Sequence, residues 1–298
     1  MIGKFGMSKT ISVKMKSELV SGWDTSLRGW ARLFGFAGLV VVFVPVLLVL
    51  RGLKLSAADR VPKLFHGLCI ALVGIKPRVR GKIPSVDAAQ KTPMIVVCNH
   101  SSYLDIPVLG SIIDGCFVAK SEVGTWPFIG TMARFQNTVF LERKSTRAAA
   151  HRNILRENLE AGNNLIFFPE GTSSDGMRTL PFKSTLFSVV EKPLADGQYV
   201  KVQPVTILCT EIGGLPMGRS WRPYYAWYGD MTLAKHAWEV FKIGAFTVDV
   251  IFHDPVTIED FGNRKMLADY CERAVSDGVN QCVTGRFKKE KSKKKLAG

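Results

Sequence analysis

Two short motifs hold the residues of this chain that could do chemistry. The first, at residues 99–105, places Asp105 five residues after His100, and the second, at residues 168–172, contains Glu170. A carboxylate that holds an imidazole fixes its tautomer and makes it an effective general base. Positions i and i+5 of a regular helix point apart, so this pair can meet only if the histidine precedes the helix and the acid lies in its first turn.

The residues around the first motif favour that arrangement. Residues 93–98 form a short, apolar, β-branched run that is typical of a buried strand. Asn99 and the two serines after His100 can cap a helix that continues through residues 106–109. We therefore expect His100 in a strand-to-helix turn and Asp105 at the start of the helix.

The second motif has the same layout. Residues 163–168 predict another buried strand, and Pro169 forces a polar turn directly after it. If the two strands run parallel in one sheet, Glu170 and His100 leave it at the same edge, where α/β enzymes place their chemistry. Spacing alone also fits a structural histidine and a Glu170 that merely caps the next segment.

Together the motifs resemble the glycerolipid acyltransferase family, which includes the bacterial 1-acylglycerol-3-phosphate acyltransferases. The resemblance runs from about residue 67 to residue 260, and four blocks follow the family's order: 99–105, 140–143, 168–172 and 202–205. It implies an α/β enzyme in which His100 and Asp105 are catalytic. It also implies the substrate-binding residues, which are Lys120, Arg143, Glu170, Gly171, Thr172 and Lys183.

One departure from the family bears on the acceptor. Many lysophosphatidate acyltransferases have an arginine after the Glu-Gly-Thr sequence that helps hold phosphate, whereas this chain has Ser173. Residues 170–184 and 224–230 are similar to the alphaproteobacterial branch that includes lyso-ornithine lipid acyltransferases. We therefore expect lyso-ornithine lipid as the leading acceptor, in ornithine lipid biosynthesis. Lysophosphatidate, the precursor of phosphatidic acid, is the alternative, and the enzyme could use both.

The expected chemistry is acyl transfer from a thioester, either acyl carrier protein or CoA, to a lysolipid hydroxyl. His100 would take the hydroxyl proton and Asp105 would orient the ring, so the substrate replaces the serine of a Ser-His-Asp triad. No G-x-S-x-G nucleophile motif occurs in the chain. Glu170, as an ionised acceptor, would hold a hydroxyl or ammonium, and the amides of Gly171 and Thr172 could donate to a head group or oxyanion.

Arg143 is the expected partner of an anionic group, because its planar guanidinium binds phosphate or carboxylate through two hydrogen bonds. The remaining histidines show no metal-ligand spacing with His100, so we expect neither a metal nor a resident cofactor. A non-catalytic, membrane-anchored binding protein that uses its basic tail to bind lipid or nucleic acid is the rival hypothesis. The presence of His100, Asp105 and Glu170 counts against it.

The net charge of +15 lies at the two ends of the chain. Residues 1–82 carry +11 and residues 286–298 carry +6, whereas residues 83–285 carry −2. A nearly neutral middle excludes nucleic acid as the expected partner, and basic ends suit an anionic membrane surface. We expect a membrane-anchoring region at 1–82, an α/β acyltransferase domain at 83–285 and a basic, disordered tail at 286–298.

Residues 33–50 contain no charge and, at about 1.5 Å per residue, could just cross a bilayer. A second apolar stretch at residues 64–73 leaves open a helical hairpin that dips into one leaflet. A signal peptide is disfavoured because the segment starts far from Met1 and no cleavage site follows it. The six cysteines have no paired spacing, which favours reduced thiols. We therefore expect the inner membrane, with the active site facing the cytoplasm.

The rest of the chain predicts a largely parallel sheet flanked by helices. Strands are expected at 116–119, 138–141, 165–168, 200–208 and 246–252, and helices at 147–161, 182–191 and 264–277. Residues 213–228 are expected to be a loop. Its aromatic residues could line an acyl groove, lie at the lipid interface or pack in the core.

Overall fold

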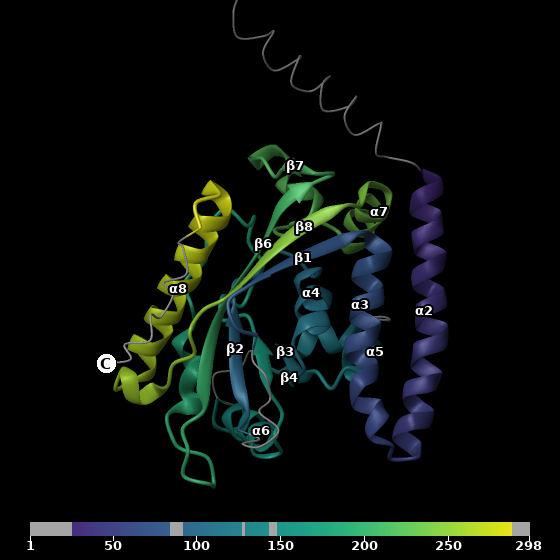
Figure 1. Ribbon diagram of the computed structural model, residues 1–298. Helices are drawn as coiled ribbons and strands as arrows, with labels where there is room; N and C mark the ends of the chain where they lie inside the picture. Colours follow the sequence, from purple (N-terminus) through teal and green to yellow (C-terminus); the bar gives the residue numbers. More distant parts are fainter. Residues whose placement is uncertain (1–25, 84–91, 127–128, 143–147, 288–298) are drawn as a thin grey trace, which may run out of the picture.

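A computed structural model describes residues 26–83, 92–126, 129–142 and 148–287 (Figure 1). Its sheet has the strand order β1-β8-β6-β2-β5-β3-β4, and the short β7 pairs with β6. All pairings are parallel except those of β6 with β7 and β8. The strands are β1 (Ile75–Arg80), β2 (Met94–Cys98), β3 (Cys116–Lys120), β4 (Val139–Leu141), β5 (Leu165–Phe167), β6 (Lys201–Ile212), β7 (Leu215–Pro216) and β8 (Phe246–Phe252).

Helices cover both faces of this sheet. The α-helices are α2 (Ser26–Gly52), α3 (Val61–Val73), α4 (Asp105–Ile112), α5 (Ile129–Phe135), α6 (Ala148–Glu160), α7 (Leu233–Ile243) and α8 (Arg264–Thr284). The 3-10 helices are η1 (Ser56–Arg60), η2 (Ser121–Thr125), η4 (Ser184–Val190), η5 (Arg219–Tyr224) and η6 (Ile258–Asp260).

The alternation of side chains along β2 shows how the core is divided. Val96 and Cys98 face a core layer that includes α3, α4 and α7, whereas Ile95 and Val97 face a layer that includes α6, η4 and α8. All four side chains are buried. A strand that is apolar on both faces needs helices on both sides, as in other parallel sheets.

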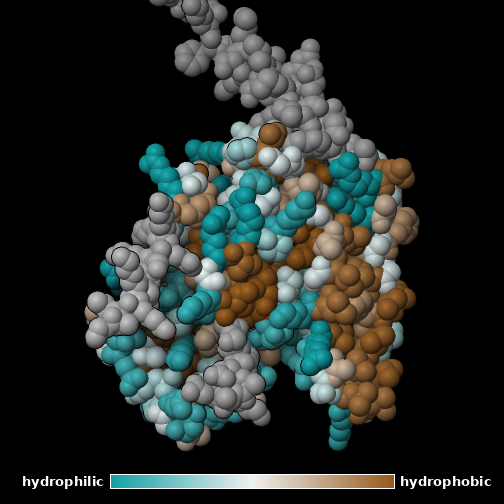
Figure 2. Space-filling model, in the orientation of Figure 1, coloured by the Kyte–Doolittle hydropathy of each residue, from teal (hydrophilic) through white to brown (hydrophobic). Residues whose placement is uncertain are grey.

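Helix α2 lies outside these layers and packs against α3 and α7 (Figure 1). It is the one helix among the described residues that is long and apolar enough to cross a membrane. Several of its large apolar side chains are exposed, and they form part of the hydrophobic surface at the right of Figure 2. They are Leu27, Trp30, Phe34, Val41, Val42, Val46, Leu48 and Val49.

Both ends of α2 are bonded to the α/β domain. Near its start, Arg28 Nη1 donates to Ile243 O at 2.9 Å and Arg32 Nη1 donates to Phe241 O at 2.9 Å, at the carboxyl end of α7. At its other end, Arg51 Nη2 donates to the backbone oxygen of the last residue of α5 at 2.8 Å. Cationic side chains at these helix carboxyl ends satisfy terminal carbonyls and fit the helix dipole.

The predicted α/β class and largely parallel sheet are confirmed, and the structure adds elements that the sequence analysis missed. Strand β1, helix α5 and helix α7 were not predicted. Because β1 belongs to the sheet, the sheet begins before residue 83, where the sequence analysis started the α/β domain. The helix predicted at residues 182–191 is instead the 3-10 helix η4. The predicted loop at residues 213–228 contains β7 and η5.

Candidate active site

His100 and Asp105 meet as their spacing predicted. His100 lies in the turn after β2, Asp105 is the first residue of α4, and His100 Nδ1 donates to Asp105 Oδ2 at 3.0 Å. The same oxygen accepts the backbone N–H groups of Ser101 at 2.8 Å and Ser102 at 2.9 Å. The turn therefore fixes the carboxylate, and the carboxylate fixes the imidazole, leaving Nε2 to act as a base.

Hydrogen bonds from three other segments hold the turn that carries His100. Asn99 does not cap α4 as expected: its side-chain amide pairs with both backbone groups of Ile207 on β6. Ser174 N donates to His100 O at 2.9 Å, and Trp227 N donates to Ser101 O at 2.8 Å. These contacts bring the loop after Glu170 and the aromatic loop against the His100 turn, so both lie beside the candidate site.

Tyr225 is a site residue that the sequence analysis did not single out. It is buried, and its hydroxyl donates to Asp105 Oδ1 at 3.1 Å. Burial raises the pKa of Tyr225 well above its usual range, and the nearby Asp105 carboxylate acts in the same direction. The phenol therefore remains a hydrogen-bond donor at physiological pH and holds the carboxylate oxygen opposite the one that His100 uses.

Glu170 leaves the sheet beside His100. Strands β2 and β5 run parallel as neighbours, and the ring of Phe168, just after β5, stacks on His100 with centroids 4.0 Å apart. Glu170 is 3% exposed, and neither of its oxygens makes a hydrogen bond of good geometry to the described residues. The site thus presents a base and a buried carboxyl group at one sheet edge.

The protonation state of Glu170 differs from the expectation of an ionised acceptor. Burial raises its pKa to about 8; the backbone amides of Leu180 and His100 offset part of this shift, and Asp105 and Glu272 add to it. A buried carboxyl without a cation favours the neutral form. Glu170 is therefore largely protonated at neutral pH in the free enzyme and can donate one hydrogen bond.

The other predicted substrate-binding residues lie around this edge. Gly171 has φ of +68°, which favours glycine, and its amide donates to Phe168 O, so it is used by the turn and is not available to substrate. Thr172 is exposed, and Lys183 is exposed with its ammonium beside Gly171. Lys120 ends β3 at the same edge. Arg143 lies outside the described residues.

No group of three or more histidine, cysteine or acidic side chains in the described ranges is placed to hold a metal ion. The six cysteines are reduced and buried. The arrangement that the site does offer is an oriented imidazole beside a neutral carboxyl group. It can remove a proton from a bound hydroxyl and contact the attacking or leaving group.

Comparisons with known proteins agree with this chemistry. The acyltransferase family profile matches residues 76–208. The chain is similar to the lyso-ornithine lipid O-acyltransferase of Rhizobium meliloti, with 36% identity over 83% of this chain and 84% of that protein. It is also similar to the lyso-ornithine lipid O-acyltransferase of Rhodobacter capsulatus, with 39% identity over 72% of this chain and 74% of that protein.

A solved structure shares the fold over nearly the whole chain. The crystal structure of the 1-acyl-sn-glycerophosphate acyltransferase from Thermotoga maritima superposes with a TM-score of 0.60 and 26% identity, covering 93% of this chain and 99% of that chain. The fold, the proton-transfer chemistry that the site can support and the sequence relatives all point to the same family. This chain therefore belongs to the acyltransferase family and is a lysolipid O-acyltransferase.

Proposed function

We propose that the enzyme transfers a fatty acyl group from an acyl thioester to the free hydroxyl of lyso-ornithine lipid. The observation that carries this proposal is the pattern of relatives. Proteins named lyso-ornithine lipid O-acyltransferase match at 36–39% identity over 72–83% of the chain. The 1-acyl-sn-glycerol-3-phosphate acyltransferase of Neisseria gonorrhoeae matches at 32% over 61% of the chain.

In the proposed reaction, His100 Nε2 takes the proton of the acceptor hydroxyl as its oxygen attacks the thioester carbonyl. The Asp105 carboxylate, held by Tyr225 and the turn amides, stabilises the imidazolium that forms. The proton then passes to the leaving thiolate, which departs as a thiol on acyl carrier protein or CoA. Glu170, next to His100, contacts the acceptor. No enzyme nucleophile is needed.

Ser173 is the residue that bears on the head group. It is half-buried beside the catalytic turn and offers a neutral hydroxyl where many lysophosphatidate acyltransferases have an arginine. One charge-assisted contact, worth about 1.5–3 kcal/mol, is therefore missing for a phosphomonoester. An acceptor with an amino-acid head group does not need this contact.

The acceptor assignment predicts a measurable preference. Purified enzyme with labelled acyl thioester is expected to acylate lyso-ornithine lipid at least as efficiently as lysophosphatidate. Ser173→Arg is expected to shift the ratio of kcat/KM values toward lysophosphatidate by up to about tenfold for each 1.4 kcal/mol of contact regained. Ser173→Gln, which adds length without charge, serves as the matched control. An enzyme that uses lysophosphatidate well and ignores lyso-ornithine lipid contradicts the proposal and favours the phosphatidate pathway.

We also propose that α2 lies in one leaflet of the inner membrane, with the active site facing the cytoplasm. The support is its attachment at both ends. Arg32 and Arg51 bind backbone carbonyls of α7 and α5, and about 30 Å of helix separates them. If α2 crossed the bilayer, these two parts of one α/β domain would lie on opposite sides. An apolar helix docked along a domain fits an interfacial anchor instead.

Cysteine labelling tests this placement, because the native cysteines are buried. Ser26 and Leu53, at the two ends of α2, are both exposed and can each be replaced by cysteine. A membrane-impermeant maleimide is expected to label neither site in intact spheroplasts and both in inverted vesicles. Val283→Cys, at an exposed position of α8, reports the side of the α/β domain. Labelling of only one end of α2 in spheroplasts would show a spanning helix.

A further inference from the structure

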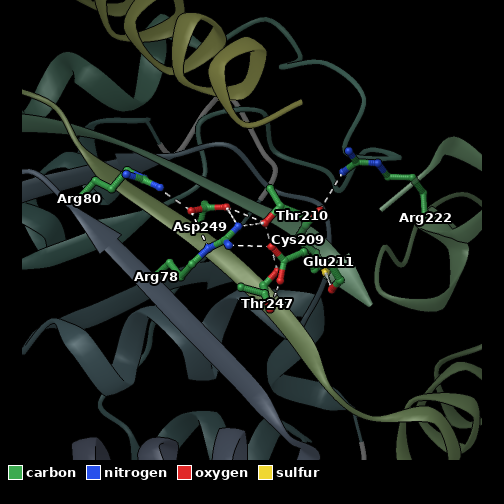
Figure 3. Close-up of polar contacts among 8 residues, drawn as sticks. All are labelled: Arg78, Arg80, Cys209, Thr210, Glu211, Arg222, Thr247 and Asp249. Carbon is green, nitrogen blue, oxygen red and sulfur yellow. Dashed lines mark hydrogen bonds and ion pairs between the residues drawn. The ribbon is translucent and has the colours of Figure 1, made fainter. Parts of the chain in front are cut away.

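Arg222, in η5, is a buried cation without a carboxylate partner in the described part of the chain. It is 5% exposed, its Nη1 donates to Cys209 O on β6 at 3.3 Å, and its Nε has no hydrogen-bond partner. Figure 3 contrasts it with Arg78, whose guanidinium contacts Asp249 at 2.7 Å and Glu211 at 2.6 Å. A buried guanidinium is costly unless an anion and full hydrogen bonding accompany it.

This arginine lines a partly open recess beside the catalytic turn. The recess is narrow: it has about 170 Å³ of space between atoms, counting the part that is open to solvent, and essentially no room for a water-sized sphere. Its lining residues are Ser101, Asp175, Gly176, Cys209, Met217, Arg222, Tyr225 and Ala226. Ser101 Oγ is also buried without a hydrogen-bond partner. Two unsatisfied polar groups therefore lie around one narrow recess, and a ligand group that enters as the lining side chains move apart would satisfy both.

The recess is directly connected to the catalytic pair. Ser101 follows His100 in the chain, and its amide donates to Asp105. Tyr225 lines the recess and donates its hydroxyl to the other oxygen of Asp105. Strand β6, which Arg222 contacts, lies on one side of β2, whereas β5, which leads to Glu170, lies on the other. The strand that Arg222 contacts and the strand that leads to Glu170 therefore flank β2 on its two sides.

The charges of the recess complement a zwitterion. Asp175 lines the same space as Arg222, yet no ion pair or hydrogen bond joins the two in the described part of the chain; an Asp175 oxygen instead accepts the amide of Met177 at 2.9 Å. One cation and one carboxylate around a single recess fit a head group that carries both an anion and a cation. A phosphomonoester dianion would be repelled by Asp175.

We propose that Arg222 and Ser101 bind the carboxylate of the acceptor's amino-acid head group, making Arg222 a specificity-determining residue. This inference rests on the proposed function, in which the acceptor is an N-acylated ornithine with a free carboxylate and a free ammonium. The planar guanidinium suits a carboxylate, and the hydroxyl of Ser101 can donate a further hydrogen bond. When the acceptor binds, its carboxylate gives Arg222 the ion-pair partner that it lacks among the described residues.

The test compares two acceptors that differ only in the carboxylate. One is lyso-ornithine lipid, and the other is the putrescine amide of the same hydroxy fatty acid, which keeps the hydroxyl and the ammonium. The wild-type enzyme is expected to prefer the carboxylate-bearing acceptor in kcat/KM by about 10- to 100-fold. Arg222→Gln is expected to reduce that ratio of kcat/KM values by at least about tenfold, mainly by raising KM for the carboxylate-bearing acceptor.

Two further variants serve as controls for this test. Arg219→Gln removes the same charge from an exposed position of η5 and is expected to retain the wild-type preference. Arg222→Lys keeps the charge without the planar group and is expected to show an intermediate preference; it carries the test if Arg222→Gln does not fold. A purely structural role for Arg222 would lower activity with both acceptors by the same factor, and this result would overturn the assignment.

The outcomes also distinguish a failure of the role of Arg222 from a failure of the proposed function. If the wild-type enzyme acylates lysophosphatidate but neither ornithine-type acceptor, the proposed function fails. If it acylates lyso-ornithine lipid and Arg222→Gln or Arg222→Lys leaves the preference for the carboxylate unchanged, only the role of Arg222 fails. A wild-type enzyme that uses both ornithine-type acceptors equally well also overturns the assignment of Arg222.

Discussion

Replacing His100 with alanine is expected to lower kcat by at least about 10²-fold, because a positioned general base contributes about 10²–10⁴-fold to such a proton transfer. KM for the acceptor should change little, since the imidazole acts mainly in the transition state. The side chain of His100 is 18% exposed, so its removal leaves no sealed core cavity. Initial rates of labelled acyl transfer in detergent, measured for the variant and the wild-type enzyme, test this expectation. Thermal unfolding should be the same for both proteins, which shows that the variant is folded.

Asp105→Asn separates orientation from the base itself. The amide keeps the size of the side chain but removes its charge, and it can present an N–H to His100 Nδ1 and so favour the wrong tautomer. Two backbone amides and the Tyr225 hydroxyl, which now donate to the carboxylate, also lose a charged acceptor. We expect a loss of kcat similar to or milder than that of His100→Ala. Near-wild-type turnover of His100→Ala would reject the mechanism.

The pairing of His100 with Asp105 could be predicted from the sequence because it depends on local structure. A β-branched run before His100 and a helix start at Asp105 bring the two side chains together within one turn. The parallel pairing of β2 with β5 likewise follows from two buried apolar runs, each followed by a polar turn. Short-range patterns of this kind determine which sheet edge the chemistry occupies.

The rest of the site depends on contacts that no local pattern contains. Tyr225 reaches Asp105 from 120 residues away, and its role follows only from the path of the loop that carries it. Arg222 occupies the same loop and becomes distinctive only because it is buried and forms no ion pair with the described residues. Residues 184–190 had the apolar content of a helix, but Phe187, Val189 and Val190 are all buried, and a 3-10 turn packed against α6 and α8 accommodates them.

The ionisation of Glu170 also could not be predicted from local sequence. Its position at the sheet edge could be predicted, but its protonation state could not, because the shift comes from burial by segments distant in sequence. The unfolded chain ionises Glu170 near its usual pKa of 4.5, whereas the folded protein holds the proton up to about pH 8. Between these values the folded state binds one more proton than the unfolded state, so stability falls as pH rises.

Glu170→Gln is therefore expected to stabilise the protein increasingly above the unfolded pKa. The difference in unfolding free energy between variant and wild type should grow by about 1.4 kcal/mol per pH unit from about pH 4.5 to about pH 8 and then level off. Burial lowers the pKa of His66 and His236 to about 4, so both histidines favour unfolding as pH falls below 6.5. Both proteins contain these histidines, so their contribution cancels when the unfolding free energy of the wild type is subtracted from that of the variant.

Thermal or denaturant unfolding of both proteins in one detergent, from pH 5 to pH 9, measures this difference. Glu259→Gln makes the same chemical change at an exposed position and is expected to show no such growth. A constant difference between Glu170→Gln and wild type across this range would show that Glu170 ionises normally in the folded protein. A buried carboxyl group that costs stability and has no cationic partner among the described residues is consistent with a role in binding, which supports a contact between Glu170 and the acceptor.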